Sequence, residues 1–272
     1  KPSKVEITKF PDGEKYVRVD DDVAGEKVVL VQSIHHEPDN FLFEYILLCD
    51  TVRDLGAKSI VGVMPYFAYA RQDDRFRPGE AVSFKTVAKL VESVGTAELF
   101  SIDMHQHRVE RASDVFTIPV HNLSAAPLLA EYVEANVSLE RPIVIGPDEE
   151  SERWASSAAK VINADHGVLE KKRLGPDKVE IRPRSHDVRR RDVLVMDDII
   201  STGGTILEAS RILKEQGARR IIVACTHPLL VDDALSRIYE SGVEIVIGTN
   251  SVPSPVSYVS VAPLLADAIR KL

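Results

Sequence analysis

Residues 193–205 read Val193-Leu194-Val195-Met196-Asp197-Asp198-Ile199-Ile200-Ser201-Thr202-Gly203-Gly204-Thr205. The run opens with four consecutive apolar residues, which predict a fully buried strand. Two carboxylates follow where that strand should end, and a turn of small residues then opens a helix. We therefore predict a strand, a turn and a helix in direct succession.

The turn has the outline of a phosphate-binding site. Gly203 and Gly204 allow the backbone N–H groups of residues 202–205 to face one anion, and the next helix presents its positive N-terminus there. Additional donors are the hydroxyls of Ser201, Thr202 and Thr205. Asp197 and Asp198 suit vicinal sugar hydroxyls or a divalent metal ion. The expected ligand is a phosphorylated ribose, and the alternative is an ordinary acidic turn before a capped helix.

The composition is that of a globular protein, and the net charge indicates that any anion-binding site covers only a small part of its surface. The 272 residues suffice for one large or two medium domains. A net charge of −8 argues against a broad nucleic-acid or anionic-membrane surface, because both depend on positive charge. Cys49 and Cys225 lie in apolar runs, which indicates buried thiols rather than a disulfide or metal site. Since no apolar run approaches the ~18 residues of a membrane span, we expect a cytoplasmic enzyme.

Two polar segments in the first half of the chain can be interpreted either as binding sites or as ordinary surface structure. Alternating residues flank Phe10-Pro11-Asp12-Gly13-Glu14, which predicts a hairpin with an exposed Phe and two acids at its tip. From spacing alone, a plain turn is the better interpretation. Residues 66–80 follow a predicted strand and mix aromatic residues with Arg71, Arg75 and Arg77. Such a segment binds a nucleotide or forms a salt-bridged surface loop, and the spacing favours neither.

A candidate metal cluster lies in the segment Leu99-Phe100-Ser101-Ile102-Asp103-Met104-His105-Gln106-His107. If the whole segment is extended, Asp103, His105 and His107 share one face, because side chains alternate along a strand. A histidine in the core or at an interface is an equally good interpretation.

Asp148-Glu149-Glu150 follows another predicted buried strand. Asp148 is therefore a helix N-cap or a metal ligand, and three acids exceed what a cap requires. The basic triplet Lys171-Lys172-Arg173 lies before Gly175-Pro176, in a predicted mobile loop. Such a basic run is most often exposed to solvent, and it would have a functional role if the loop closed over the phosphate site.

The two halves of the chain repeat one pattern. Residues 53–63 contain Leu55-Gly56-Ala57-Lys58 before an apolar strand, and residues 214–224 repeat this order around Gly217. We predict two α/β halves, each an open parallel sheet wrapped by helices, with the boundary near residue 140. In such sheets ligands gather at the carboxyl ends of the strands, where the polar clusters described above all lie.

These clusters resemble the motifs of the ribose-phosphate pyrophosphokinase family over nearly all 272 residues. The matching segments are residues 10–14, 69–73, 103–105, 147–148, 171–173, 197–205 and 264–270. Residues 197–205 are also similar to the diphosphate-sugar binding motif of type I phosphoribosyltransferases. The resemblance implies an α/β fold of two duplicated phosphoribosyltransferase type I-like domains, with open, mainly parallel sheets flanked by helices. Residues 1–139 would form the ATP side with oligomer contacts, and residues 140–272 the ribose 5-phosphate side, with the last helix packing back on the first domain.

The resemblance also implies a reaction and its residues. The family transfers the diphosphoryl group of ATP to the C1 hydroxyl of ribose 5-phosphate with Mg²⁺, giving 5-phosphoribosyl diphosphate and AMP for nucleotide biosynthesis. The catalytic cations would be Lys171 and Arg173. The ATP-binding residues would be Phe10, Asp12, Glu14, Arg71, Gln72 and His105. Ribose 5-phosphate would be bound by Arg173, Asp197, Asp198, Ser201, Thr202, Gly203, Gly204 and Thr205, and the metal by His105 and Asp148.

The family's hairpin at residues 10–14 reaches into a neighbouring subunit's adenine site, so a homo-oligomer is implied, with no nucleic-acid or membrane partner. The family pattern usually opens with a strand and helix before this hairpin, which suggests a truncated sequence or a sheet without one edge. Two alternatives remain. A phosphoribosyltransferase that consumes the diphosphate sugar would share residues 197–205, and a non-catalytic regulatory homologue would share the whole fold.

Overall fold

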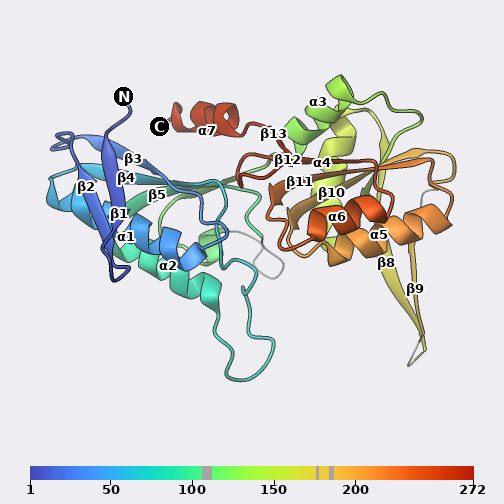
Figure 1. Cartoon of the computed structure of the whole chain (residues 1–272), viewed down its shortest axis with the longest axis horizontal. Coiled ribbons are helices and arrows are strands. Elements are labelled where there is room, and N and C mark those ends of the chain that lie inside the picture. Colours follow the sequence, from blue (N-terminus) through green and yellow to red (C-terminus); the bar gives the residue numbers. More distant parts are fainter. Residues whose placement is uncertain (106–111, 176–177, 184–186) are drawn as a thin grey trace. The chain divides into compact units, whose positions relative to one another are not determined.

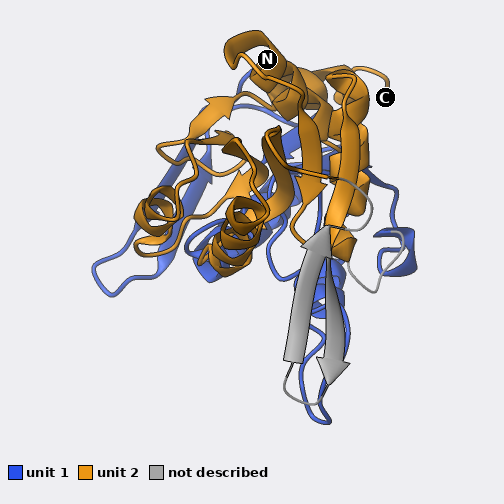
Figure 2. Ribbon diagram, turned by 90° about the vertical axis from the view of Figure 1, so that its right-hand side faces the viewer, with its two compact units in different colours: residues 1–123 blue, residues 124–272 orange. Residues whose placement is uncertain are grey.

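The computed structural model describes residues 1–105, 112–175, 178–183 and 187–272, and from residue 170 to residue 183 it describes backbone only. Contacts divide the chain into two compact units, Lys1–Leu123 and Ser124–Leu272 (Figure 2). The sequence placed this boundary at residues 139 and 140 instead. The difference arises because helix α3 (Ala126–Asn136) packs on α4 (Glu152–Val161) in the second unit.

The first unit is built on a four-stranded parallel sheet in the order β3-β4-β5-β6 (Figure 1). Its elements are β1 (Val5–Lys9), β2 (Lys15–Val19), β3 (Lys27–Val31), α1 (Pro38–Asp54), β4 (Ser59–Met64), α2 (Ser83–Ser93), β5 (Thr96–Ile102), the 3-10 turn η1 (Ala112–Asp114) and β6 (Val120–Leu123). Helix α1 packs on β3 and β4, and α2 packs on β5. Helices alternate with these strands because parallel neighbours need a crossover connection.

A glycine allows α1 to approach this sheet closely. Tyr45 of α1 is fully buried, and its hydroxyl lies 2.8 Å from Thr96 Oγ1. A Cβ on Gly62 of β4 would lie 2.4 Å from that hydroxyl. Only a residue without a side chain leaves room for the ring at this point.

Strand β3 is more exposed than its apolar sequence indicates. The apolar run of residues 28–31 is typical of a buried strand, but Val29 and Val31 are 39% and 66% exposed, and only Leu30 is buried. The physical reason is position, because β3 is an edge strand of its sheet. An apolar run predicts burial only where both faces and both neighbours are covered.

Strands β1 and β2 form the predicted antiparallel hairpin. Gly13 supplies the positive φ of 97° at its tip, and its N–H donates to the carbonyl of Phe10. Strand β2 packs on α1, where Lys15 and Glu44 form an ion pair with both side chains 10% exposed. The hairpin is therefore anchored through β2, while residues 10–14 at its tip are exposed.

The second unit holds a seven-stranded sheet in the order β13-β12-β11-β10-β7-β8-β9. Its elements are α3, β7 (Ile143–Gly146), η2 (Glu149–Ser151), α4, β8 (Asp165–Gly175), β9 (Lys178–Pro183), β10 (Asp192–Ile200), α5 (Gly204–Glu215), β11 (Arg220–Pro228), α6 (Ala234–Glu240), β12 (Ile245–Thr249), β13 (Ser257–Val259) and α7 (Ala262–Ile269). All neighbouring strands are parallel except β8 and β9, which are antiparallel.

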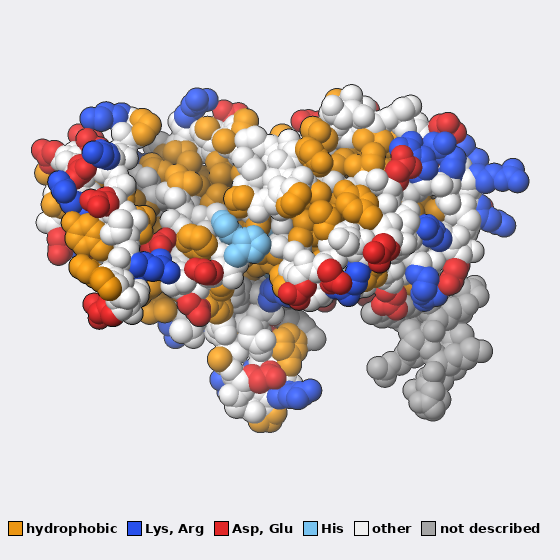
Figure 3. Space-filling view, in the orientation of Figure 1, with side chains coloured by type: hydrophobic (Ala, Val, Ile, Leu, Met, Phe, Trp, Pro, Cys, Tyr) orange, Lys and Arg blue, Asp and Glu red, His pale blue; other side chains and the backbone are white. Residues whose placement is uncertain are grey.

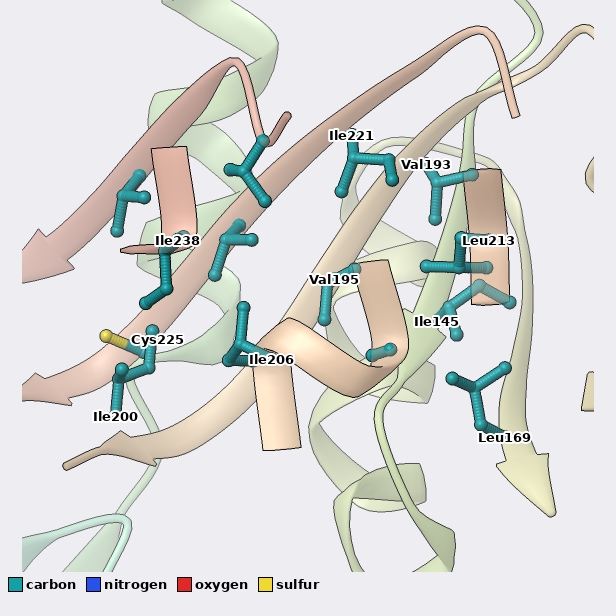
Figure 4. Packing of buried hydrophobic residues seen from close by; sticks show 14 of the residues in the cluster. Ile145, Leu169, Val193, Val195, Ile200, Ile206, Leu213, Ile221, Cys225 and Ile238 are labelled. Carbon is teal, nitrogen blue, oxygen red and sulfur yellow. The ribbon is translucent and has the colours of Figure 1, made fainter. Parts of the chain in front are cut away.

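Side-chain alternation in β10 divides the core of this unit into two layers. Val193 and Val195 pack with Ile206 and Leu213 of α5 on one face of the sheet (Figure 4). The intervening residue, Leu194, packs with α3 and α4 on the other face. The predicted open, mainly parallel sheet flanked by helices is confirmed, because every second residue of the strand faces a different pair of helices.

Both cysteines are buried and free, as the sequence predicts. None of the helices in the described part of the chain is both long and apolar enough to cross a membrane. Acidic and basic side chains are interspersed on the face shown in Figure 3. This distribution agrees with a site for anions that is local rather than spread over the surface.

Candidate active site

Strand β10 leads through residues 201–203 into α5, as the sequence predicts. Gly203 has a φ of 77°, and a Cβ there would lie 3.1 Å from Ile238 Cδ1. At Gly204 the nearest described atom to an added Cβ would be Thr202 Oγ1, at 3.9 Å. Gly203 therefore shapes the turn. Gly204 instead leaves open space beside the first N–H groups of α5, which lack partners within the helix and favour an anion.

The hydroxyl residues of this turn are accessible: Thr202 and Thr205 are exposed, and Ser201 is half-buried. We call residues 201–205 the phosphate turn. Its backbone N–H groups and hydroxyls are the donors that a phosphate group requires.

Two carboxylates precede the phosphate turn on β10. The strand continues past both of them to Ile200, further than predicted, because it pairs with β11 beyond the point where its pairing with β7 ends. Asp197 and Asp198 are only 8% and 3% exposed. Asp197 Oδ1 accepts a hydrogen bond of 2.9 Å from the N–H of Asp198.

The pKa of Asp197 is raised well above its usual value. Burial is the main cause, and the negative charges of Asp198 and Asp148 add to it. Asp148 acts on Asp197 because it follows β7, the parallel neighbour of β10. Three carboxylates therefore influence one another at the carboxyl edge of this sheet, where a cation or hydroxyl donors would relieve their repulsion.

Asp148 is the N-cap of the turn η2, which is one of the two roles predicted for it. Its Oδ1 accepts from the N–H of Ser151 at 3.1 Å, and the Ser151 hydroxyl lies 3.2 Å from the N–H of Asp148. Gly146 makes room for this cap, because a Cβ there would lie 2.4 Å from Ser151 Oγ. The cap fixes the carboxylate in place and leaves its second oxygen for another partner.

The hairpin tip in the first unit presents its predicted residues to solvent. Phe10 is 50% exposed and packs edge-on against Tyr16, with ring centroids 5.9 Å apart. Asp12 and Glu14 are exposed as well. An accessible ring beside two acids can stack on a base and accept from its amino group.

The connection between β4 and α2 contains Arg71 and Gln72 (Figure 1). Gln72 Nε2 donates to the carbonyl of Asp74 at 3.1 Å, and Arg75 Nε donates to the carbonyl of Glu80 at 2.9 Å. These bonds from side chains to backbone carbonyls hold the segment together, and they are compatible with both the nucleotide-binding and the surface-loop interpretation. Arg71 is exposed, so its guanidinium is accessible to an anion.

The extended metal face predicted for residues 99–107 is wrong. Strand β5 ends at Ile102, and Asp103 has a φ of 37°, which breaks the alternation. The break is held by a 2.7 Å bond from the N–H of Asp103 to the carbonyl of Leu123. His105 is half-buried, and His107 lies outside the described residues.

The loop predicted around Lys171 and Arg173 is a strand in the described backbone, and its predicted mobility stays a prediction. Residues 165–175 form β8, which pairs with β9 and places Lys171 opposite Ile181 and Arg173 opposite Val179. The reason is strand propensity, because charged residues alternate with β-branched residues in β9. The tip of this hairpin, residues 176–177, lies outside the described residues.

Family models match both units. The N-terminal domain of ribose phosphate pyrophosphokinase matches residues 1–95, and the phosphoribosyl transferase domain matches residues 114–258. The chain belongs to the ribose-phosphate pyrophosphokinase family. The family confirms the resemblance inferred from the motifs, and the second match covers the phosphate turn and both aspartates of β10.

Relatives in this family match almost the whole chain. The ribose-phosphate pyrophosphokinase of Methanothermobacter thermautotrophicus is 44% identical over 98% of this chain and 91% of its own length. That of Aquifex aeolicus is 34% identical over 98% of this chain and 86% of its own length. The crystal structure of phosphoribosylpyrophosphate synthetase from Mycobacterium smegmatis has a TM-score of 0.87 and 31% identity, covering 98% of this chain and 89% of that one.

Within the family's fold, the structure brings together Asp148, Asp197, Asp198 and the phosphate turn in the second unit. The predicted ATP-binding residues all belong to the first unit. Their roles, and those of Lys171 and Arg173, stay predictions.

Sequence analysis missed one contact with the phosphate turn. Arg237 of α6 donates from Nη2 to the carbonyl of Thr202 at 2.8 Å. Its ion pair with Asp233, four residues earlier, was visible in the sequence but is typical of any exposed helix.

Proposed function

We propose that this chain transfers the diphosphoryl group of ATP to the C1 hydroxyl of ribose 5-phosphate, giving 5-phosphoribosyl 1-diphosphate and AMP for nucleotide biosynthesis. Family membership supports the reaction. The observation that carries it in this structure is the succession of a buried carboxylate pair on β10 and an open phosphate turn before α5. A sugar phosphate matches both features, because its hydroxyls can donate to the carboxylates and its phosphate can bind at the turn.

The 5-phosphate binds at the phosphate turn, where the N–H groups of α5 and the hydroxyls of Ser201, Thr202 and Thr205 donate to its oxygens. Asp197 and Asp198 accept from the ribose hydroxyls, directly or through a metal ion. Their mutual repulsion in the free protein is relieved by these donors. The sugar is thereby held at both its phosphate and its hydroxyls.

ATP is bound by residues of the first unit. Phe10, Asp12 and Glu14 hold adenine from a neighbouring subunit of a homo-oligomer, and Arg71 and Gln72 bind on the nucleotide side. The C1 oxygen attacks the β-phosphorus in line, the bond from that phosphorus to the α-phosphate oxygen breaks, and AMP leaves. Catalysis of this kind consists mostly of positioning and cations. Lys171 and Arg173 supply those cations.

Mg²⁺ is the metal that this site would use, and bound to the triphosphate it would neutralise phosphoryl charge. The donor set fits, because Asp148 and the carboxylate pair offer the hard oxygen ligands that Mg²⁺ prefers. The described residues contain no group of three or more His, Cys, Asp and Glu side chains placed to hold a metal ion. Mg²⁺ commonly binds through one or two carboxylates together with substrate phosphates, which suits Asp148 as a contact, and the metal role of His105 stays a prediction.

The test is AMP release from ATP, ribose 5-phosphate and Mg²⁺ by the purified protein. We expect AMP and 5-phosphoribosyl 1-diphosphate in equal amounts, with Lys171→Ala slower by about a hundredfold, equivalent to about 3 kcal/mol of lost transition-state stabilisation. AMP release that does not depend on the pentose phosphate would contradict the proposal. Binding of both substrates without turnover would favour a regulatory homologue, and consumption of the diphosphate sugar with a base would favour a phosphoribosyltransferase.

A further inference from the structure

The phosphate turn is held by one segment that the proposed reaction does not otherwise use. The N–H of Leu230 donates to the carbonyl of Ile200 at 2.9 Å, and the N–H of Val231 donates to the carbonyl of Ser201 at 3.0 Å. Arg237 of α6 continues this series, because its Nη2 donates to the carbonyl of Thr202 at 2.8 Å. Three successive carbonyls are thus bound by residues 230–237.

The third of these bonds controls an amide of the phosphate turn. A peptide unit is planar and trans, so its carbonyl and the N–H of the following residue point in opposite directions. When the guanidinium of Arg237 holds the Thr202 carbonyl on the α6 side, the N–H of Gly203 points away from α6. Rotation of this peptide would instead present the negative end of its dipole to a bound phosphate.

The backbone at Gly203 depends on this hydrogen bond more than an ordinary turn would. Gly203 has a φ of 77°, and a glycine rotates more freely than any other residue. The side chains of Ala234 and Ile238 approach Gly203, with Ile238 Cδ1 3.1 Å from where a Cβ would lie. Packing therefore limits the position of the turn, and the bond to Arg237 sets the orientation of its peptide.

Arginine suits this task better than lysine. The planar guanidinium of Arg237 contacts two acceptors at once, because Nη2 donates to the Thr202 carbonyl while Nε lies 2.8 Å from Asp233 Oδ1 in an ion pair without hydrogen-bond geometry. Asp233 lies one turn earlier in sequence, at the start of α6, and restrains the arginine stem. The side chain is 41% exposed, so the core does not depend on it.

We propose that Arg237 is a positioning residue for ribose 5-phosphate, acting through the Thr202 carbonyl to keep the Gly203 amide directed at the 5-phosphate. This inference rests on the proposed function of the phosphate turn and adds a residue outside the 197–205 motif. The arginine itself does not contact the sugar phosphate.

The test compares Arg237→Met with Arg211→Met. Arg211 is a matched control, because it lies on α5 and forms an exposed ion pair of 2.6 Å with Glu215, four residues away. We expect Arg237→Met to raise both the Kd for ribose 5-phosphate, measured by calorimetry, and its KM by about tenfold, the effect of losing about one charged hydrogen bond. The KM for ATP and the kcat should stay within about twofold of the parent, and Arg211→Met should change none of these values.

A second variant separates positioning from folding. Arg237→Lys keeps a charged donor and should recover part of the lost affinity, with a melting temperature equal to that of the parent. Equal affinity of Arg237→Met and parent for ribose 5-phosphate would overturn the inference, as would equal rises in KM for both substrates. If the parent binds ribose 5-phosphate but releases no AMP, the proposed function fails while the calorimetric comparison still decides the role of Arg237.

Discussion

Replacement of Asp197 by Asn should make the ligand-free protein more stable at neutral pH. The side chain is 8% exposed, and burial together with the charges of Asp198 and Asp148 raises its pKa well above the usual value. At neutral pH the folded state therefore holds an unfavourable charge or keeps a proton that the unfolded state has released, and either lowers its stability. The amide removes that charge and still accepts the 2.9 Å bond from the N–H of Asp198 through Oδ1.

The sign of the pH dependence follows from proton binding. Below the usual aspartate pKa of 3.8, the group is protonated in both folded and unfolded states and contributes no difference. As pH rises from 3.8 through the raised pKa, the unfolded state releases its proton first, so the folded state loses relative stability. The stability advantage of Asp197→Asn should therefore be small at acid pH, grow across this window and then reach a plateau.

One unit of pKa shift corresponds to about 1.4 kcal/mol of folding free energy, so the height of the plateau measures how far folding raises the pKa of Asp197. For a unit of this length, each kcal/mol raises the melting temperature by about 2–4 °C. The assay is urea unfolding of parent and variant from pH 4.5 to pH 8, with EDTA and without substrates. In the same preparations, the variant should bind ribose 5-phosphate more weakly than the parent.

Asp192→Asn is a matched control on the same strand. Asp192 is fully buried, but Arg219 donates two hydrogen bonds to it, at 2.7 and 2.5 Å. Its replacement should destabilise the protein by about 1–3 kcal/mol, because charged donors lose their acceptor. A parent more stable than Asp197→Asn at pH 8, or a difference between them that does not change with pH, would refute the electrostatic account of the carboxylate cluster.

Four further substitutions test the site and the fold. Gly203→Ala should destabilise the protein by about 1–2 kcal/mol, because the residue has a φ of 77°, whereas Gly204→Ala should leave unfolding in urea unchanged yet raise the KM for ribose 5-phosphate. Gly62→Ala should cost about 1–3 kcal/mol by overpacking, since its Cβ would lie 2.4 Å from the Tyr45 hydroxyl, and urea unfolding measures the loss. Phe10→Ala should raise the KM for ATP several-fold, while the melting temperature stays constant because the ring is 50% exposed.

The second unit could be predicted closely from sequence because its signals are local. A run of apolar residues in β10, followed by carboxylates and two glycines, specifies strand, acids and turn within 13 residues. Neighbours within a few positions determine backbone propensity and turn geometry, so such a run has the same meaning in any fold. The family resemblance depended on the same short motifs.

Two of the errors concern features that depend on distant residues. Val31 belongs to an apolar run like that of β10, yet it is 66% exposed, because strand order placed β3 at an edge. Asp103 leaves the extended conformation where its N–H donates to the carbonyl of Leu123, and no local sequence pattern predicts that bond.

By itself, the sequence determined which residues are candidates for the chemistry: the carboxylates of β10, the glycines and hydroxyls of the phosphate turn, and the hairpin tip around Phe10. Only the tertiary structure decided the surroundings of these residues. The pKa of Asp197 is raised mainly by burial and further by the charges of Asp198 and of Asp148, which follows the adjacent β7, and the bond from Arg237 to Thr202 joins residues 35 positions apart. Electrostatic repulsion and hydrogen bonding act through space, whereas the sequence shows only separation along the chain.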